Sequence, residues 1–193
     1  MAIEKARDVQ LKLEFDNESQ QTSETINHTA ESLAQYGIPM YQTRLVCESE
    51  LKHERIKIND PEDIAALLQN YYKDRDREEF IVVFLNRANI VIGLHVASVG
   101  GLSQTIVEPR QVFKAAFLAS AASIICAHNH PSGETKPSHE DIAMTRILAR
   151  AGLFFRLPVL DHIIIGDSNF CSLREDGEFD FDNQDPELSL NYP

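Results

Sequence analysis

Residues 123–152, SIICAHNHPSGETKPSHEDIAMTRILARAG, carry the main signal for the fold of this chain. The apolar, β-branched run 123–130 predicts a buried strand. The Pro-Ser-Gly sequence that follows favours a turn. Helical spacing of the apolar residues then predicts a helix over 138–151, with Gly152 as its stop. A strand, a turn and a helix in this order indicate an α/β layer architecture.

The rest of the central region repeats this alternation of strand and helix patterns. Further helices are expected at 61–73 and 109–121, and further strands at 78–86, 89–100, 160–167 and 169–173. Each of these two helices has a proline in its first turn, a position that tolerates proline. A Gly-Asp-Ser-Asn turn joins the last two strands into a closing pair. We therefore expect an α/β fold with a mixed central β-sheet flanked by helices.

The composition indicates one domain with a polar segment at each end. The chain has 193 residues, and 43% of them are hydrophobic, which is enough for a substantial core. Residues 1–35 are rich in polar side chains and predict a flexible arm. We place the domain at 36–174 and an acidic tail at 175–193. Both segments could pack on the domain or on a second subunit, so a homodimer is among the assemblies that the sequence allows.

Charge and cysteine content limit the partners and the compartment. The net charge of −12 opposes non-specific binding to phosphate backbones, so we expect no direct nucleic-acid ligand. The three cysteines are widely spaced and form no CxxC pair, which indicates a reducing cytoplasm. The first twenty residues lack the apolar core of a signal peptide, and no apolar run approaches the roughly 18 residues of a membrane span. We expect a cytoplasmic protein without a membrane segment.

The end of the strand at 123–130 predicts a metal site. His128 and His130 are two residues apart on an extended strand, so their side chains point the same way. The turn and the helix start can return Asp141 to these two rings. Two histidines and one aspartate form a three-ligand set with an open fourth position, as in catalytic zinc sites. The same aspartate also completes a Ser138-x-x-acid capping box. The two interpretations stay open together, because Asp141 could be a ligand while Ser138 caps the helix.

The spacing of these residues resembles the JAMM motif of MPN-type metallopeptidases and deubiquitinases, H-x-H-P-x(6 or 7)-S-x-x-D. The longer sequence HNHPSG…PS…D, preceded by EPRQVF and followed by LDHIIIG, is similar to the RadC family of that superfamily. The resemblance runs from about residue 78 to residue 173. It implies a JAB/MPN-like fold with the zinc site at a strand end and a helix start.

The resemblance also implies an activity and a role for each site residue. Zn²⁺ held by His128, His130 and Asp141 would activate water for attack on an amide or isopeptide bond of a peptide or protein. An upstream glutamate serves as general base, and the match to E-x-F-x-V selects Glu78. Its neighbour Glu79 is the alternative, since only one of two adjacent strand residues can face the metal. Ser138 would stabilise the oxyanion.

Other residues and functions remain open at this level. Asn129 is a candidate for positioning the loop. Asp161 and His162 could orient a metal ligand or simply satisfy hydrogen bonds within the fold.

Two other enzyme classes are excluded. The three residues of an HNH nuclease motif are dispersed along the sequence, whereas His-Asn-His is consecutive here. A zinc deaminase would need the motifs H-x-E and P-C-x-x-C, which are absent. The alternative function is a non-catalytic, DNA-repair-associated or partner-binding module that keeps the MPN fold. Residues 1–50 contain no Gly-rich helix-hairpin-helix pattern, which disfavours DNA binding.

Overall fold

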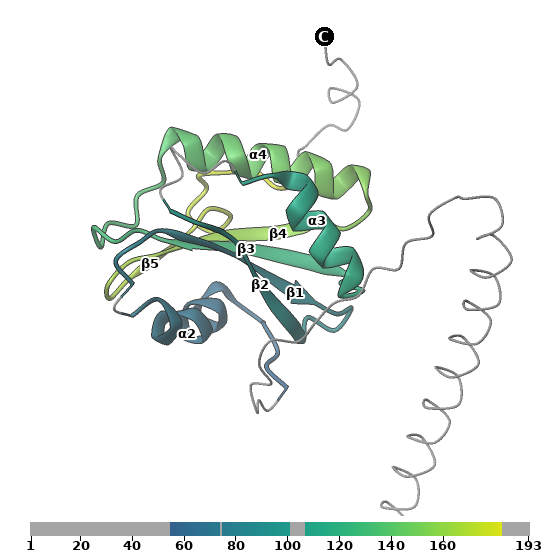
Figure 1. Ribbon diagram of the computed structural model, residues 1–193, viewed down its shortest axis with the longest axis horizontal. Coiled ribbons are helices and arrows are strands. Elements are labelled where there is room, and N and C mark those ends of the chain that lie inside the picture. Colours follow the sequence, from purple (N-terminus) through teal and green to yellow (C-terminus); the bar gives the residue numbers. More distant parts are fainter. Residues whose placement is uncertain (1–54, 74, 101–106, 183–193) are drawn as a thin grey trace, which may run out of the picture. The chain divides into compact units, whose positions relative to one another are not determined.

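A computed structural model describes residues 55–73, 75–100 and 107–182 of the chain. The expected flexible arm, residues 1–35, lies outside the described residues, and so does the end of the expected tail from residue 183 on. The described residues form strands and helices at each place where the sequence predicts them (Figure 1).

Five strands form a mixed sheet in the order β2-β1-β3-β4-β5. The strands are β1 (Glu79–Leu85), β2 (Val91–Val99), β3 (Ser123–Asn129), β4 (Val159–Ile165) and β5 (Phe170–Ser172). The neighbours β3 and β4 run parallel, whereas the other three pairs are antiparallel. The expected closing hairpin is the β4–β5 pair. The mixed central sheet predicted from the sequence is therefore confirmed.

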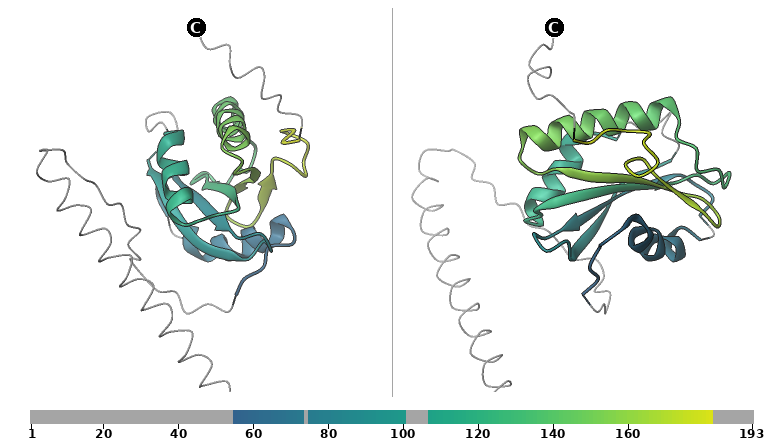
Figure 2. Two further views of the ribbon diagram at one scale, coloured as in Figure 1. Left: turned by 90° about the vertical axis from the view of Figure 1, so that its right-hand side faces the viewer. Right: turned by 180° about the vertical axis from the view of Figure 1, so that it is seen from behind.

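Helices cover both faces of this sheet (Figures 1 and 2). One face carries α2 (Pro61–Tyr72), and the opposite face carries α3 (Pro109–Leu118) and α4 (His139–Phe154). Since α4 joins β3 to the parallel strand β4, its first turn lies close to the end of β3. None of the helices in the described ranges is long and apolar enough to cross a membrane.

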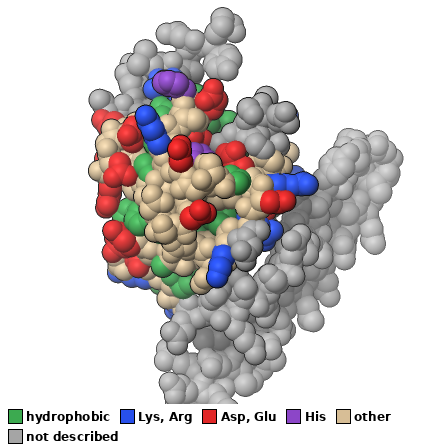
Figure 3. Space-filling view, turned by 90° about the vertical axis from the view of Figure 1, so that its left-hand side faces the viewer, with side chains coloured by type: hydrophobic (Ala, Val, Ile, Leu, Met, Phe, Trp, Pro, Cys, Tyr) green, Lys and Arg blue, Asp and Glu red, His purple; other side chains and the backbone are tan. Residues whose placement is uncertain are grey.

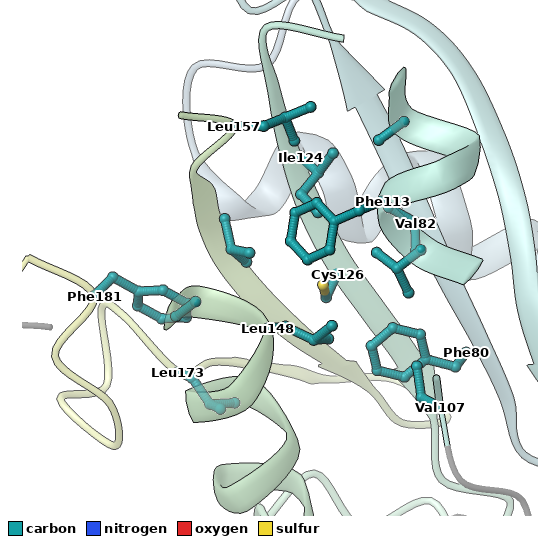
Figure 4. Close-up of a cluster of buried hydrophobic side chains, with 14 of the residues drawn as sticks. Phe80, Val82, Val107, Phe113, Ile124, Cys126, Leu148, Leu157, Leu173 and Phe181 are labelled. Atoms are coloured by element: carbon teal, nitrogen blue, oxygen red, sulfur yellow. The ribbon is translucent and has the colours of Figure 1, made fainter. Parts of the chain in front are cut away.

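The strand β1 divides the core into two parts because its successive side chains point to opposite faces. Phe80, Val82 and Phe84 pack in the cluster beneath α3 and α4, where Figure 4 shows Phe80 and Val82 with Phe113 and Leu148. The alternate residues of β1, Ile81, Val83 and Leu85, pack with α2. The same alternation assigns a face to each acidic residue at the start of this strand.

Two predicted boundaries differ from the structure. The prediction that Gly152 stops its helix is wrong, because α4 continues to Phe154 and is capped by Phe155. A Cβ at Gly152 would lie 2.7 Å from the carbonyl oxygen of Leu157, so this glycine permits a close approach of the backbone. Phe179 and Phe181 are also buried in the cluster beneath α4. The packed region therefore continues beyond residue 174, the predicted end of the domain, into the predicted tail.

Candidate metal centre

The strand β3 delivers the first histidine to the face of the sheet that α3 and α4 cover. β3 lies between β1 and β4, and its residues Ile124 and Cys126 belong to the cluster beneath α3 and α4. His128 continues this alternation and is fully buried. Its ring is stacked 6.2 Å from the ring of Phe80, with only 9° between their planes. This contact holds the imidazole against the core at the strand end.

The start of α4 delivers the aspartate through a capping box. The Ser138 N–H and hydroxyl donate to Asp141 Oδ2 over 2.7 and 2.6 Å, and the Asp141 N–H donates back to Ser138 Oγ over 3.1 Å. The other oxygen, Asp141 Oδ1, is buried and accepts no hydrogen bond from the described residues. The capping interpretation is thus confirmed, and it leaves one carboxylate oxygen for a second role.

Four residues, Glu78, His128, His130 and Asp141, each contribute one candidate ligand atom here, and these four atoms lie within 4.8 Å of one another. His128 Nε2 lies 2.9 Å from His130 Nε2 and 3.3 Å from Asp141 Oδ1. His130 Nε2 lies 3.6 Å from Asp141 Oδ2. Tetrahedral zinc with bonds of about 2.0–2.1 Å would place its ligands about 3.3 Å apart. The spacing of the three residues therefore fits a divalent metal ion, and an orphaned buried carboxylate oxygen is a polar group that such an ion would satisfy.

The tautomer of His130 also suits a metal ligand. Its Nδ1 lies 2.8 Å from the carbonyl oxygen of Glu134. A carbonyl oxygen only accepts, so in a neutral ring Nδ1 carries the hydrogen and donates it. The Nε2 atom then holds an unprotonated electron pair that points to the site. A backbone carbonyl of the turn after β3 thus fixes which nitrogen faces His128.

Glu78 and not Glu79 lies on the same face as the histidines. Glu78 Oε1 is 3.9 Å from His128 Nε2. Glu79 is buried on the α2 side, where it accepts a 2.7 Å hydrogen bond from the Tyr71 hydroxyl and pairs with Arg75 at 3.2 Å. The sheet alternation therefore gives these two acids different surroundings.

Asn129 holds the backbone on both sides of Glu78. Its Oδ1 accepts from the Glu79 N–H over 2.8 Å, and its Nδ2 donates to the Arg77 carbonyl over 3.0 Å. The Gly100 N–H donates to the Glu78 carbonyl over 2.7 Å. Asn129 thus positions the segment before β1 rather than the loop after β3, to which the sequence had assigned it.

His162 extends the site behind His128. Its Nε2 lies 2.8 Å from His128 Nδ1, and its Nδ1 lies 2.6 Å from Thr145 Oγ1. Of the two interpretations left open by the sequence, the structure supports the one in which His162 contacts a candidate ligand. Its neighbour Asp161 accepts from the Ser172 hydroxyl and the Arg174 N–H, so it joins β4 to the end of β5 and the residues that follow.

Thr145 was not identified from the sequence. It is buried on α4, four residues beyond Asp141. Its position on the same helix face as Asp141 is the one signal that could have indicated it.

Burial and charge shift the pKa values of the site residues in different directions. Burial lowers the pKa of His128 well below its usual value, and the neighbouring His162 acts in the same direction. The Asp141 carboxylate, whose Oδ2 lies 3.6 Å from His130 Nε2, raises the pKa of His130. Burial acts to raise the pKa of Asp141, but the contacts with His130, His128 and Ser138 outweigh it and lower that pKa. A neutral His128 beside an ionised Asp141 is the protonation state that a metal ion requires.

The site opens at the end of the molecule where β3 meets α4. His128 and Asp141 are fully buried, whereas the side chains of Glu78 and His130 are 18% and 17% exposed. Figure 3 views the end that is on the left in Figure 1, and it shows histidine side chains together with several acidic ones. The two partly exposed residues are therefore the ones that a substrate or water can reach.

Comparison with known proteins identifies the family. Residues 58–178 match the family model described as RadC-like JAB domain. A UPF0758 protein of Salinibacter ruber is 47% identical over 137 residues, which cover 71% of this chain and 59% of that relative. A UPF0758 protein of Methanosarcina acetivorans is 42% identical over 130 residues, or 67% of this chain and 57% of the relative. The chain thus spans a little over half the length of these relatives. Over the region that contains its candidate metal centre, it belongs to the RadC-like JAB domain family.

Proposed function

We propose that this chain is a zinc-dependent metallopeptidase or isopeptidase-like hydrolase. The observation that carries the proposal is the convergence of His128, His130 and Asp141 on one point, with the Glu78 carboxylate beside it. Peptides or proteins are the proposed substrate class, because the resemblance to JAMM metallopeptidases implies amide hydrolysis at a metal site with an adjacent general base.

The three ligand residues and Glu78 divide the work. His128, His130 and Asp141 would hold a zinc ion, which when bound supplies a Lewis acid that acidifies water and polarises a carbonyl. Glu78 takes the proton of the attacking water and later gives it to the leaving amine. Its Oε1 lies 3.9 Å from His128 Nε2, farther than the 2.9–3.6 Å that separate the other three residues, so Glu78 lies beside the proposed ligand set.

Ser138 has a structural role and a proposed chemical one. Its hydroxyl donates to Asp141 Oδ2, and so holds that carboxylate in place. Stabilisation of an oxyanion would require the hydroxyl hydrogen to turn from Asp141 to the substrate. The oxyanion role of Ser138 remains a prediction.

Metal analysis and hydrolysis of a quenched peptide library test the proposal together. The full chain should contain one zinc ion, lose hydrolysis on chelation and regain it when zinc is returned. His128→Ala should lose the metal, and undiminished zinc in this variant would disprove the ligand assignment. Zinc binding without cleavage of peptides or isopeptide-linked peptides would favour the non-catalytic module. Salt-dependent retention on DNA would then test whether that module binds DNA.

A further inference from the structure

A chain of buried hydrogen bonds joins the two ends of the candidate metal centre from behind. Thr145 Oγ1 donates to the Asp141 carbonyl oxygen over 2.7 Å and lies 2.6 Å from His162 Nδ1. His162 Nε2 lies 2.8 Å from His128 Nδ1. This series of hydrogen bonds therefore runs from the backbone of Asp141 through two side chains to the ring of His128. All four residues are buried, so water does not compete for these bonds.

The number of available hydrogens determines the donor and the acceptor of each hydrogen bond in this series. The Asp141 carbonyl only accepts, so the single hydroxyl hydrogen of Thr145 is used there. Thr145 Oγ1 must then accept from His162, which places the His162 hydrogen on Nδ1. A neutral imidazole has one N–H, so His162 Nε2 accepts, and His128 Nδ1 is the donor to it. The remaining nitrogen, His128 Nε2, is left with an electron pair directed at Asp141 Oδ1 and His130 Nε2.

We propose that Thr145 and His162 are positioning residues that fix the tautomer and orientation of the His128 ring. The inference rests on the proposed metal site, for which His128 must present Nε2 without a hydrogen. Partners of this kind, which accept the second ring N–H of a ligand histidine, orient the ring and raise its basicity. Here the last acceptor is the backbone of Asp141, itself a proposed ligand. The ligand from β3 and the ligand from α4 are thereby set by one network.

A matched pair of variants at position 145 isolates the hydroxyl. Thr145→Val keeps the shape of the side chain but removes the oxygen, so His162 Nδ1 loses its acceptor. His162 can then carry its hydrogen on Nε2 instead and donate it to His128 Nδ1. Thr145→Ser keeps the oxygen. Titration of the metal-free full chain with Zn²⁺ against a chromophoric chelator should give an affinity about 10–100-fold lower for Thr145→Val. The affinity of Thr145→Ser should stay close to that of the unaltered chain.

Long-range ¹H–¹⁵N NMR of the histidine-labelled, metal-free chain reads the tautomers directly. At neutral pH, His128 and His162 should both carry the hydrogen on Nδ1, and Thr145→Val should convert them to a mixture. A role of Thr145 in packing alone would lower the melting temperature of Thr145→Val without changing either tautomer. An Nε2–H form of His128 in the unaltered chain would overturn the inference.

These readouts separate this inference from the proposed function. If the unaltered protein takes up no zinc, the proposed function fails, whereas the NMR spectra still show which residue donates each hydrogen bond. If zinc binds with equal affinity to Thr145→Val and to the unaltered chain, the metal site stands and the positioning role of Thr145 is wrong.

Discussion

Glu78 and Glu79 are neighbours in the chain, but their carboxylates lie on opposite faces of the sheet. Glu78 Oε1 is 3.9 Å from His128 Nε2, whereas Glu79 Oε2 accepts a hydrogen bond from Tyr71 on the α2 side. The pair is therefore an internal control, because the same substitution at adjacent positions acts on the candidate site in one case and on the opposite face in the other.

Glu78→Gln should retain zinc and lose hydrolysis. Removal of a general base costs roughly 10²–10⁴-fold in rate, whereas the three proposed ligands are unchanged. Glu79→Gln should leave zinc content and hydrolysis nearly intact, since the amide can still accept from Tyr71. Zinc analysis and initial rates on one peptide substrate check both variants. The reverse result would transfer the role to Glu79, and equal small effects would mean that the base lies elsewhere.

Ser138→Ala should destabilise the domain through the start of α4. The substitution removes the acceptor of the Asp141 N–H and one of the two donors to Asp141 Oδ2. Loss of such an N-cap costs about 0.5–2 kcal/mol. Urea unfolding should show this loss, and Ser138→Thr, which keeps a hydroxyl, should show little of it. If the loss of hydrolysis in Ser138→Ala exceeds any loss of zinc, the serine also acts on the substrate.

The metal-free domain should lose stability as the pH falls from about 6.5 to about 4. Burial lowers the pKa of His162 to about 4, whereas an unfolded histidine titrates near 6.5. Within this window the unfolded state binds a proton that the folded state does not, so the free energy of unfolding decreases toward acid. The difference between the folded and unfolded pKa of His162 corresponds to roughly 3 kcal/mol. The lowered pKa of His128 acts in the same direction.

Urea unfolding of the chelator-treated chain at several pH values measures this dependence. His162→Gln removes the group from the titration, so its stability should change less across the same window. The raised pKa of His130 acts with the opposite sign, but it acts at higher pH, from its raised value down to about 6.5. A pH dependence that is unchanged in His162→Gln would contradict the assignment.

Most of the fold follows from local patterns, and the site follows from spacing. The alternation along β1 places Phe80 and Ile81 on opposite faces and determines which acid faces the histidines. Once the face of one residue in the strand is known, the sequence gives the face of each of its neighbours. The pairing of His128 with His130 needs only the period of a strand. The position of Asp141, the candidate ligand from α4, could be predicted because the turn is short and the helix start is marked by its cap.

The contacts that the sequence did not predict are those between distant segments. His162 reaches His128 because β4 is parallel to β3 in a register that pairs Cys126 with His162, and no local pattern specifies that register. Phe179 and Phe181 lie in an acidic stretch, yet they cover the cluster beneath α4. A glycine near a helix end usually marks its stop, but Gly152 lies inside α4 because the returning chain passes over it.

Gly152→Ala should therefore destabilise the domain, although alanine is favoured over glycine in a helix by up to about 1 kcal/mol. The added Cβ would lie 2.7 Å from the Leu157 carbonyl oxygen and 3.3 Å from the Val159 nitrogen, both backbone atoms of the segment that enters β4. Relief of this overlap requires α4 to move from the chain that enters β4, at a typical cost of about 1–3 kcal/mol. Gly93→Ala is the matched control, because its Cβ would meet only Phe84 Cδ2 at an ordinary 3.4 Å. Thermal unfolding should show a lowered midpoint for Gly152→Ala and little change for Gly93→Ala. A midpoint raised by Gly152→Ala would show that helix propensity outweighs this contact, and that the glycine is not required by the approach of β4.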